Sequence, residues 1–227
     1  MGTVLVRQII ADVSKALADE GTVRQWPQIT LLNWLNYAEK AVCMVKPDAY
    51  QVVGTMALSD GTLQDIPAGI ESFGRLTRNM GDDGHQPGIV IREMSLSAMD
   101  QDLYWHMATP GTTVEYFIRI PDNVRQFYVF PPIPIEAMVY VEYSCPGIPP
   151  DLVEANFTTG IVTINLPDSY KNPLFELVMF RAFDMLSSNI PGMQEKANIC
   201  LSRAIQMLTG KNDAEAQTKA RSLAEGR

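Results

Sequence analysis

The chain has 227 residues, of which 46% are hydrophobic and 19% are charged. This globular composition and length allow a buried core without disulfides, and they exclude a fibrous repeat or a chain that stays disordered. Eighteen Lys and Arg against 26 Asp and Glu give a net charge of −8, which disfavours tight, sequence-independent binding of nucleic acid.

Two helices are predicted at the start of the chain. Apolar residues recur at three- and four-residue spacing from Val6 to Leu17, and Gly21 ends this pattern. A second helix is predicted between Thr30, its N-cap, and Pro47, which stops it. The apolar stripe of this second helix consists of Leu31, Leu35, Ala38, Val42 and Val45. Joined by a short link, the two helices should pack as a hairpin.

From residue 50 to about 165 the sequence consists of short β-branched and aromatic runs separated by Gly, Pro, Asp and Asn. This pattern is typical of an antiparallel sandwich or barrel. The predicted strands are residues 50–58, 61–66, 73–77, 88–94, 112–120, 126–130, 138–144 and 160–165. Residues 95–107, between the fourth and fifth strands, are predicted to form a short irregular or helical excursion.

A block of prolines follows the strand-like run 126–130 directly. Pro131, Pro132 and Pro134 occupy three of four positions. Because proline cannot donate a hydrogen bond to a β-ladder, we expect this block to lie between strands or along a sheet edge. It can serve as a stiff hairpin loop, or as an exposed rim that meets another chain.

Two more helices are predicted towards the end of the chain. The first begins with Asn172 as its cap and Pro173 in its first turn, and the second follows Pro191 and stops at Gly210. Since each helix pair has an apolar face to cover, we predict an α+β fold. Its N- and C-terminal helix pairs form one helical layer, and an antiparallel β-sandwich or barrel-like module is inserted between them.

The predicted boundaries divide the chain into four parts. Residues 1–48 are the N-terminal helical part, residues 49–167 the β-rich module, residues 168–210 the C-terminal helical part that packs on residues 1–48, and residues 211–227 a polar tail. The thin apolar stripe of the tail predicts that it orders only on a partner, or else remains a frayed, solvated end.

The chain start lacks the basic residues, apolar block and cleavage site of a signal peptide, and no run of about 18 apolar residues suggests a membrane span. We therefore expect a soluble intracellular protein. Cys43, Cys145 and Cys200 are far apart and lie in apolar segments, which predicts buried, reduced thiols.

No residue is assigned to a catalytic, cofactor-binding or metal-binding site. The two histidines, His85 and His106, do not have metal-ligand spacing. Asp82, Asp83 and His85 share a glycine-rich loop, but the loop lacks the ligand pattern of a calcium site, so a solvated turn is predicted. The nucleophile-elbow, phosphate-loop and dinucleotide motifs are absent.

The three tryptophans and one match to a glycosylation motif are not assigned a binding role. Trp26, Trp34 and Trp105 are interpreted as core or interface anchors. The tripeptide Asn156-Phe157-Thr158 matches a glycosylation acceptor, which has no meaning without secretion.

Four segments resemble, in order, the head-to-tail adaptor proteins of short-tailed bacteriophages, relatives of tail tubular protein A. The segments are LLNWLNYAEKAVCMVKPDAY (31–50), MALSDGTLQDIPAGIESFGRLTRNM (56–80), FYVFPPIP followed by VYVEYSCPGIPPDL (127–152), and LPDSYKNPLFELVMFRAFDML (166–186). Each motif is weak alone because glycine, proline and aromatic positions encode turns and packing. Their shared order and spacing make the resemblance specific, although a counterpart of residues 211–227 is not placed by it.

The resemblance implies a non-enzymatic virion component without cofactors, made in the host cytoplasm and located at the head-tail junction. It would form a homo-oligomeric ring, expected to contain twelve copies, between the portal protein and the tail nozzle protein. DNA would pass through an axial channel without specific binding, as the acidic net charge favours, and no membrane would be contacted. The prolines at 131–134 would stiffen one rim of a ring subunit.

Two alternatives remain from the residues alone. One is a β-sandwich binding module, or an accessory tail component, that recognises protein or carbohydrate and stays small in solution. The other is an enzyme of unrecognised class, which the absence of a nucleophile, base and orienting group in the motifs disfavours.

Overall fold

The computed structural model describes residues 3–19, 25–81, 83–153 and 160–225, and only the backbone of 211–225. The chain divides into two compact units, one made of Met1–Ala49 with Pro149–Arg227 and the other of Tyr50–Ile148. The α+β class is confirmed, with a helical layer built from both ends of the chain and a module of two four-stranded sheets. The segment from Pro149 onward, which the sequence suggested for the β-rich module, groups with the helices.

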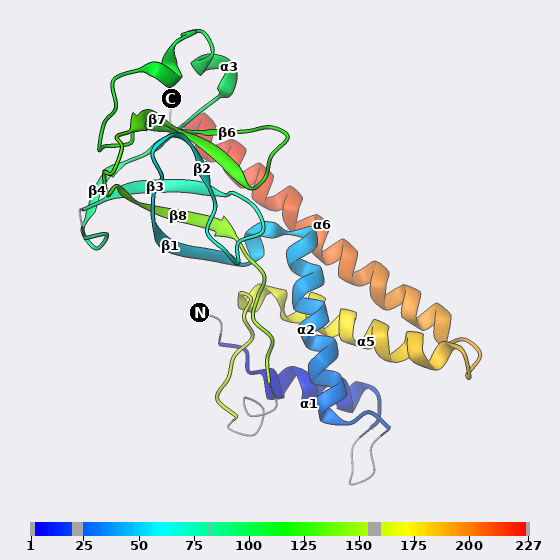
Figure 1. Ribbon diagram of the computed structural model, residues 1–227. Helices are drawn as coiled ribbons and strands as arrows, with labels where there is room; N and C mark the ends of the chain where they lie inside the picture. Colours follow the sequence, from blue (N-terminus) through cyan, green and yellow to red (C-terminus); the bar gives the residue numbers. More distant parts are fainter. Residues whose placement is uncertain (1–2, 20–24, 82, 154–159, 226–227) are drawn as a thin grey trace. The chain divides into compact units, whose positions relative to one another are not determined.

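The helical unit is organised around one central helix (Figure 1). Its elements are α1 (Val6–Ala16), α2 (Gln28–Val45), the short 3-10 turns η1 (Pro47–Ala49) and η3 (Asp168–Tyr170), α5 (Lys171–Ser187) and α6 (Met193–Glu225). Helix α5 packs against α1, α2 and α6. The N- and C-terminal helices therefore cover each other's apolar faces, as one layer.

Helix α2 begins earlier than the sequence suggested. Pro27 is its N-cap, and the Pro27 carbonyl accepts hydrogen bonds from the amides of Thr30 and Leu31, so the assignment of Thr30 as N-cap is wrong. The ring of Trp26 packs against that of Trp34, with centroids 5.0 Å apart. This aromatic contact extends the packed face of the helix towards its N-terminus.

The C-terminal helices also differ from their predicted ends. Helix α5 has Tyr170, not Asn172, as its N-cap. Helix α6 does not stop at Gly210 but continues to Glu225. One glycine inside a helix costs only about 1 kcal/mol, and the residues that follow are good helix formers, so Gly210 does not end the helix. In the described ranges, no helix combines the length and apolarity that a membrane crossing requires.

The β-module contains two sheets with a shared apolar core. The strands are β1 (Gln51–Ala57), β2 (Gly61–Asp65), β3 (Arg75–Met80), β4 (Pro87–Val90), β5 (Arg92–Met94), β6 (Tyr116–Arg119), β7 (Gln126–Ile133) and β8 (Tyr140–Pro146). The sheet orders are β1-β8-β3-β4 and β2-β7-β6-β5. All neighbouring strands are antiparallel except β5 and β6, which are parallel. Helix α3 (Leu96–Met99) and turn η2 (Trp105–Met107) follow β5.

The predicted strand 88–94 is split between the two sheets at Ile91. The Ile91 side chain is buried, and its amide donates to the carbonyl of Thr77. The strand predicted at 160–165 does not form; Thr163 makes only an isolated bridge with Leu5. A period-two apolar pattern predicts which side chains are buried, but it does not identify the strand with which a segment pairs. Residues 88–94 pair with strands of both sheets, and residues 160–165 join neither sheet.

Pro131 and Pro132 do not lie between strands or on a sheet edge, so that prediction is wrong for them, whereas Pro134 follows the end of β7 and lies between β7 and β8, as predicted. Pro131 and Pro132 lie inside β7, which pairs with β2 on one side and β6 on the other. The β2–β7 register shifts between the Gly61–Ile133 pair and the Leu63–Tyr128 pair, opposite the prolines. A bulge leaves residues outside the ladder, so prolines can be accommodated there without losing an amide bond. The prolines are buried or half-buried rather than an exposed rim.

Candidate functional site

Helix α2 is covered around most of its circumference. Its open stripe comprises Ile29, Asn33, Tyr37 and Met44, which lie about one helical turn or two apart along the same side. Three of these four side chains are apolar or aromatic. An exposed apolar stripe on an otherwise buried helix is typical of a surface that contacts another molecule.

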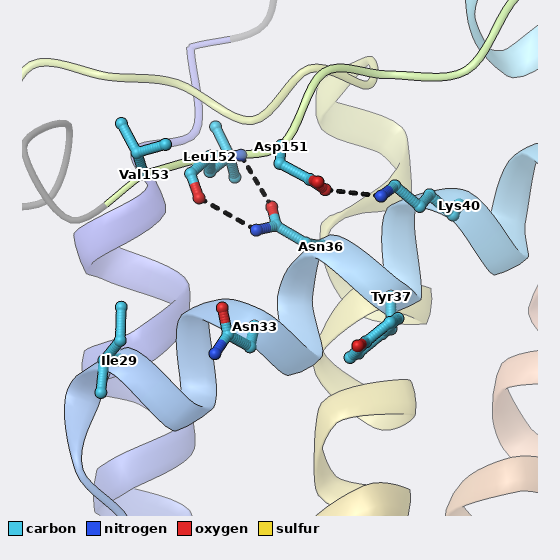
Figure 2. A pocket seen from close by; sticks show the side chains of 8 residues that line it. All are labelled: Ile29, Asn33, Asn36, Tyr37, Lys40, Asp151, Leu152 and Val153. Carbon is cyan, nitrogen blue, oxygen red and sulfur yellow. Dashed lines mark hydrogen bonds and ion pairs between the residues drawn. The ribbon is translucent and has the colours of Figure 1, made fainter.

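A pocket of about 330 Å³ lies beside this stripe. Figure 2 shows that α2 forms one wall and the segment around Leu152 forms the other. The lining residues are Ile29, Asn33, Asn36, Tyr37, Lys40, Asp151, Leu152 and Val153. Both walls belong to the helical unit, so the pocket is a feature of that unit alone.

Polar side chains of α2 hold the second wall in place. The side-chain amide of Asn36 donates to the carbonyl of Leu152, and the Leu152 amide donates back to Asn36 Oδ1, both at 2.9 Å. One turn further on, Lys40 Nζ lies 2.6 Å from Asp151 Oδ1. These contacts are drawn as dashed lines in Figure 2. The pocket is therefore preformed rather than assembled around a ligand.

Glu39 extends this attachment to a second segment. Its two carboxylate oxygens accept from the backbone amide and the side-chain amide of Asn165, at 2.9 and 2.7 Å. Burial raises the pKa of Glu39, and the hydrogen bonds from Asn165 offset part of that effect. Burial also raises the pKa of the Cys43 thiol, one turn away, to about 11, with the Glu39 charge adding to the shift.

The local sequence explains why this wall is extended. Pro149 and Pro150 have no amide hydrogen and a fixed φ, so the segment avoids helix and ladder pairing. Its backbone polar groups must then be satisfied by side chains. The Pro150 carbonyl accepts from Asn165, and Leu152 is satisfied by Asn36. Asn36, Glu39 and Lys40 are spaced so that all three reach this side of α2.

The residues that line the pocket are suited to binding another molecule rather than to catalysis. Ile29, Tyr37 and Val153 provide an exposed apolar rim, and the Asn33 amide can both donate and accept. Lys40 is held in an ion pair by Asp151. The lining thus offers no nucleophile with an adjacent base, but it fits an apolar or aromatic side chain with one polar group.

The glycine-rich loop forms a turn where it is described. The His85 amide donates to Asp83 Oδ1 at 2.9 Å, and this bond lowers the pKa of Asp83. Asp82 lies outside the described residues. Across the part of the chain that the structure describes, no group of three or more His, Cys, Asp or Glu residues is arranged to hold a metal ion.

The other residues singled out in the sequence are mostly in the core. Trp34 and Trp105 are buried and Trp26 is half-buried. All three cysteines are buried and unpaired, as predicted. Residues 156–158, with the acceptor motif, lie outside the described residues.

The α2 pocket was missed in the sequence because its second wall comes from residues more than a hundred positions away. A signal was nevertheless present. Asn36, Glu39 and Lys40 are polar residues in a helix whose apolar residues occur on several sides. Such residues at three- and four-residue spacing indicate a partner segment as readily as a solvated face.

The sequence model of the SU10 adaptor protein family matches residues 5–224. The match includes both units of the structure, all of the residues lining the pocket, and most of helix α6. A search of curated proteins finds no match.

Proposed function

Because the chain belongs to the SU10 adaptor protein family of phage head-tail adaptors, we propose that it joins the portal vertex to the tail nozzle at the head-tail junction. The family membership makes the chain a structural phage protein, a virion component that interacts with other virion proteins. The single observation that carries the proposal is the family match over residues 5–224.

The proposed assembly is a homo-oligomeric ring, expected to contain twelve copies, with an axial channel for DNA. Closed rings need two different surfaces on each subunit that fit each other. The exposed apolar stripe of α2 supports one such surface. The net charge of −8 supports passage of DNA without adhesion, since like charges repel.

The C-terminal part of α6 is the proposed contact with the portal protein. Helix α6 has 33 residues and its hairpin partner α5 has 17, so α5 can accompany only about half of it. The rest, which contains residues 211–225, extends beyond α5 by roughly 20 Å. Its sequence has a thin apolar stripe, which favours docking in a groove that supplies apolar surface.

The proposed role includes no catalysis. The described residues bring together no metal-binding cluster, and the α2 pocket offers no activated nucleophile. On this proposal, treatment with a chelator leaves the thermal unfolding transition of the protein unchanged. A fall of many degrees would contradict it.

The proposal is tested by density-gradient sedimentation with purified portal and nozzle proteins. The chain should migrate with portal rings, and nozzle protein should migrate with portal only when the chain is present. An accessory binding module would stay near the top of the gradient. If nozzle protein joins portal equally well without the chain, the bridging role is wrong.

A further inference from the structure

Three exposed apolar side chains project from the excursion after β5. Leu103, Tyr104 and Met107, here named the knob, have exposed fractions of 83%, 69% and 81%. They lie within five positions, so they are not singly scattered exposed residues of the kind found on every protein surface. The sequence predicted only an irregular excursion at this position.

The knob is held in place from beneath by Trp105, whose exposed fraction is 2%. The Trp105 indole N–H donates to Asp100 Oδ1 at 3.1 Å, and its ring contacts Tyr128 edge-on. His106 stacks on Trp105, and its Nδ1 lies 2.8 Å from the hydroxyl of Thr62. These contacts fix the backbone that carries the knob, so little backbone freedom is lost when it binds.

The surroundings of the knob are acidic. Asp100 and Asp102 precede it and are exposed, and residues 95–111 contain no Lys or Arg. Apolar anchors with acidic neighbours fit an apolar pocket that has an amide or cationic group at its rim.

The α2 pocket has these complementary properties. Its rim is apolar at Ile29, Tyr37 and Val153, and it has an amide at Asn33. Lys40 stands at the edge with one partner, Asp151, while an ammonium group has three donors. Its volume of about 330 Å³ is enough for one large side chain.

We propose that the knob of one copy of this chain occupies the α2 pocket of a second copy. Such a contact is heterologous, because it joins two different surfaces, and repetition of it produces a ring when the rotation closes. The inference rests on the proposed ring and assigns its subunit contact. Tyr104 or Met107 fills the pocket, and Asp102 approaches Lys40.

The size of the contact agrees with a weak, repeated interface. An aromatic side chain such as Tyr104 buries about 150–250 Å², compared with the roughly 800 Å² per partner of a standard interface. The knob is therefore the anchor of a larger contact, and its loss should weaken association without unfolding either copy.

Two variants of the full-length chain test the contact by sedimentation equilibrium. The knob variant carries Leu103→Ser, Tyr104→Ser and Met107→Ser, and the pocket variant carries Ile29→Asp and Val153→Asp. All five residues are exposed, so both variants should fold. The matched controls are Ile135→Ser with Met138→Ser for the knob and Ile161→Asp for the pocket, which alter residues that are also exposed.

Each variant alone should self-associate at least about tenfold more weakly than the wild type, while the controls match the wild type. An equimolar mixture of the two variants should form one-to-one pairs and nothing larger. The reason is that the knob variant still has a pocket, and the pocket variant still has a knob.

The inference is overturned if the wild type stays monomeric at every concentration, if either variant assembles like the wild type, or if the mixture stays monomeric. Portal co-sedimentation separates these failures from failure of the proposed function. A knob variant that joins portal as well as the wild type contradicts only the subunit contact. A wild type that does not join portal contradicts the adaptor role itself.

Discussion

The side chain of Asn36 binds the backbone of Leu152 through both of its polar atoms. Asn36 Nδ2 donates to the Leu152 carbonyl and Asn36 Oδ1 accepts from the Leu152 amide. A buried extended segment normally obtains such a pair of bonds from a neighbouring strand. Here a side chain of helix α2 provides both hydrogen bonds, and so the segment from Pro149 can pack on α2 and form the pocket wall.

Replacing Asn36 by Ala should lower the free energy of unfolding by about 1–3 kcal/mol, because the amide and carbonyl of Leu152 would be left without partners. Denaturant unfolding measures this. The control is Asn33→Ala, an exposed position on the same helix, where a change of less than about 0.5 kcal/mol is expected. Equal effects at the two positions would show that the Leu152 bonds contribute little.

Replacing Leu35 by Ala should cost about 2–5 kcal/mol, because the side chain is fully buried where α2 enters the helical layer. Val45 provides the contrast. The sequence placed it on the same apolar stripe, but it is exposed, so that assignment is wrong. Val45→Ala should therefore change the unfolding free energy by less than about 0.5 kcal/mol. A loss below that limit for Leu35→Ala would mean that this face is not core.

Glu39 should make stability fall as pH rises. Its pKa is raised by burial from an ordinary value of 4.5. Between pH 4.5 and the raised pKa, the folded protein keeps a proton on Glu39 that the unfolded chain has released. The contribution of Glu39 to the free energy of unfolding is therefore fully present below pH 4.5 and is lost as the pH rises through the raised pKa.

Glu39→Gln removes this titration. Its Tm relative to the wild type should therefore rise as the pH increases above 4.5, as measured by calorimetry. Glu93→Gln, which alters an exposed carboxyl, is the control. A Tm difference for Glu39→Gln that is constant with pH, or that falls, would contradict the assignment.

Deleting residues 211–227 should leave the Tm of the isolated protein nearly unchanged, because α5 is too short to accompany that part of α6. Attachment to portal rings should weaken. Co-sedimentation of the truncated and the intact protein with portal rings measures this. Equal attachment of the two would rule out the docking role, and a large fall in Tm would show that the end of α6 is part of the core.

Much of the fold could be predicted because its signals are local. The apolar periodicity of 6–17 and 31–42 identified two helices, and most alternating aromatic runs identified strands. The errors concern the ends of elements, which local signals mark poorly. Helix α2 begins at Gln28, after its N-cap Pro27, and α6 continues through Gly210, because one glycine costs a helix only about 1 kcal/mol.

The proline block and the pocket show what a single sequence does not reveal. Whether Pro131 interrupts a sheet depends on which residues stand opposite it, and here a register shift removes the need for its amide. The pocket depends on Asn36 meeting Leu152, a contact across 116 positions. Local patterns specify which residues are polar, but not which distant backbone they satisfy.

Electron microscopy of particles formed by this chain with the portal protein tests the adaptor role most directly. The proposed adaptor role predicts a closed ring of copies on the tail side of the portal, with an open axial channel and the twelvefold symmetry expected for the ring. Copies bound singly, at scattered positions, or as a disc without a channel would contradict it.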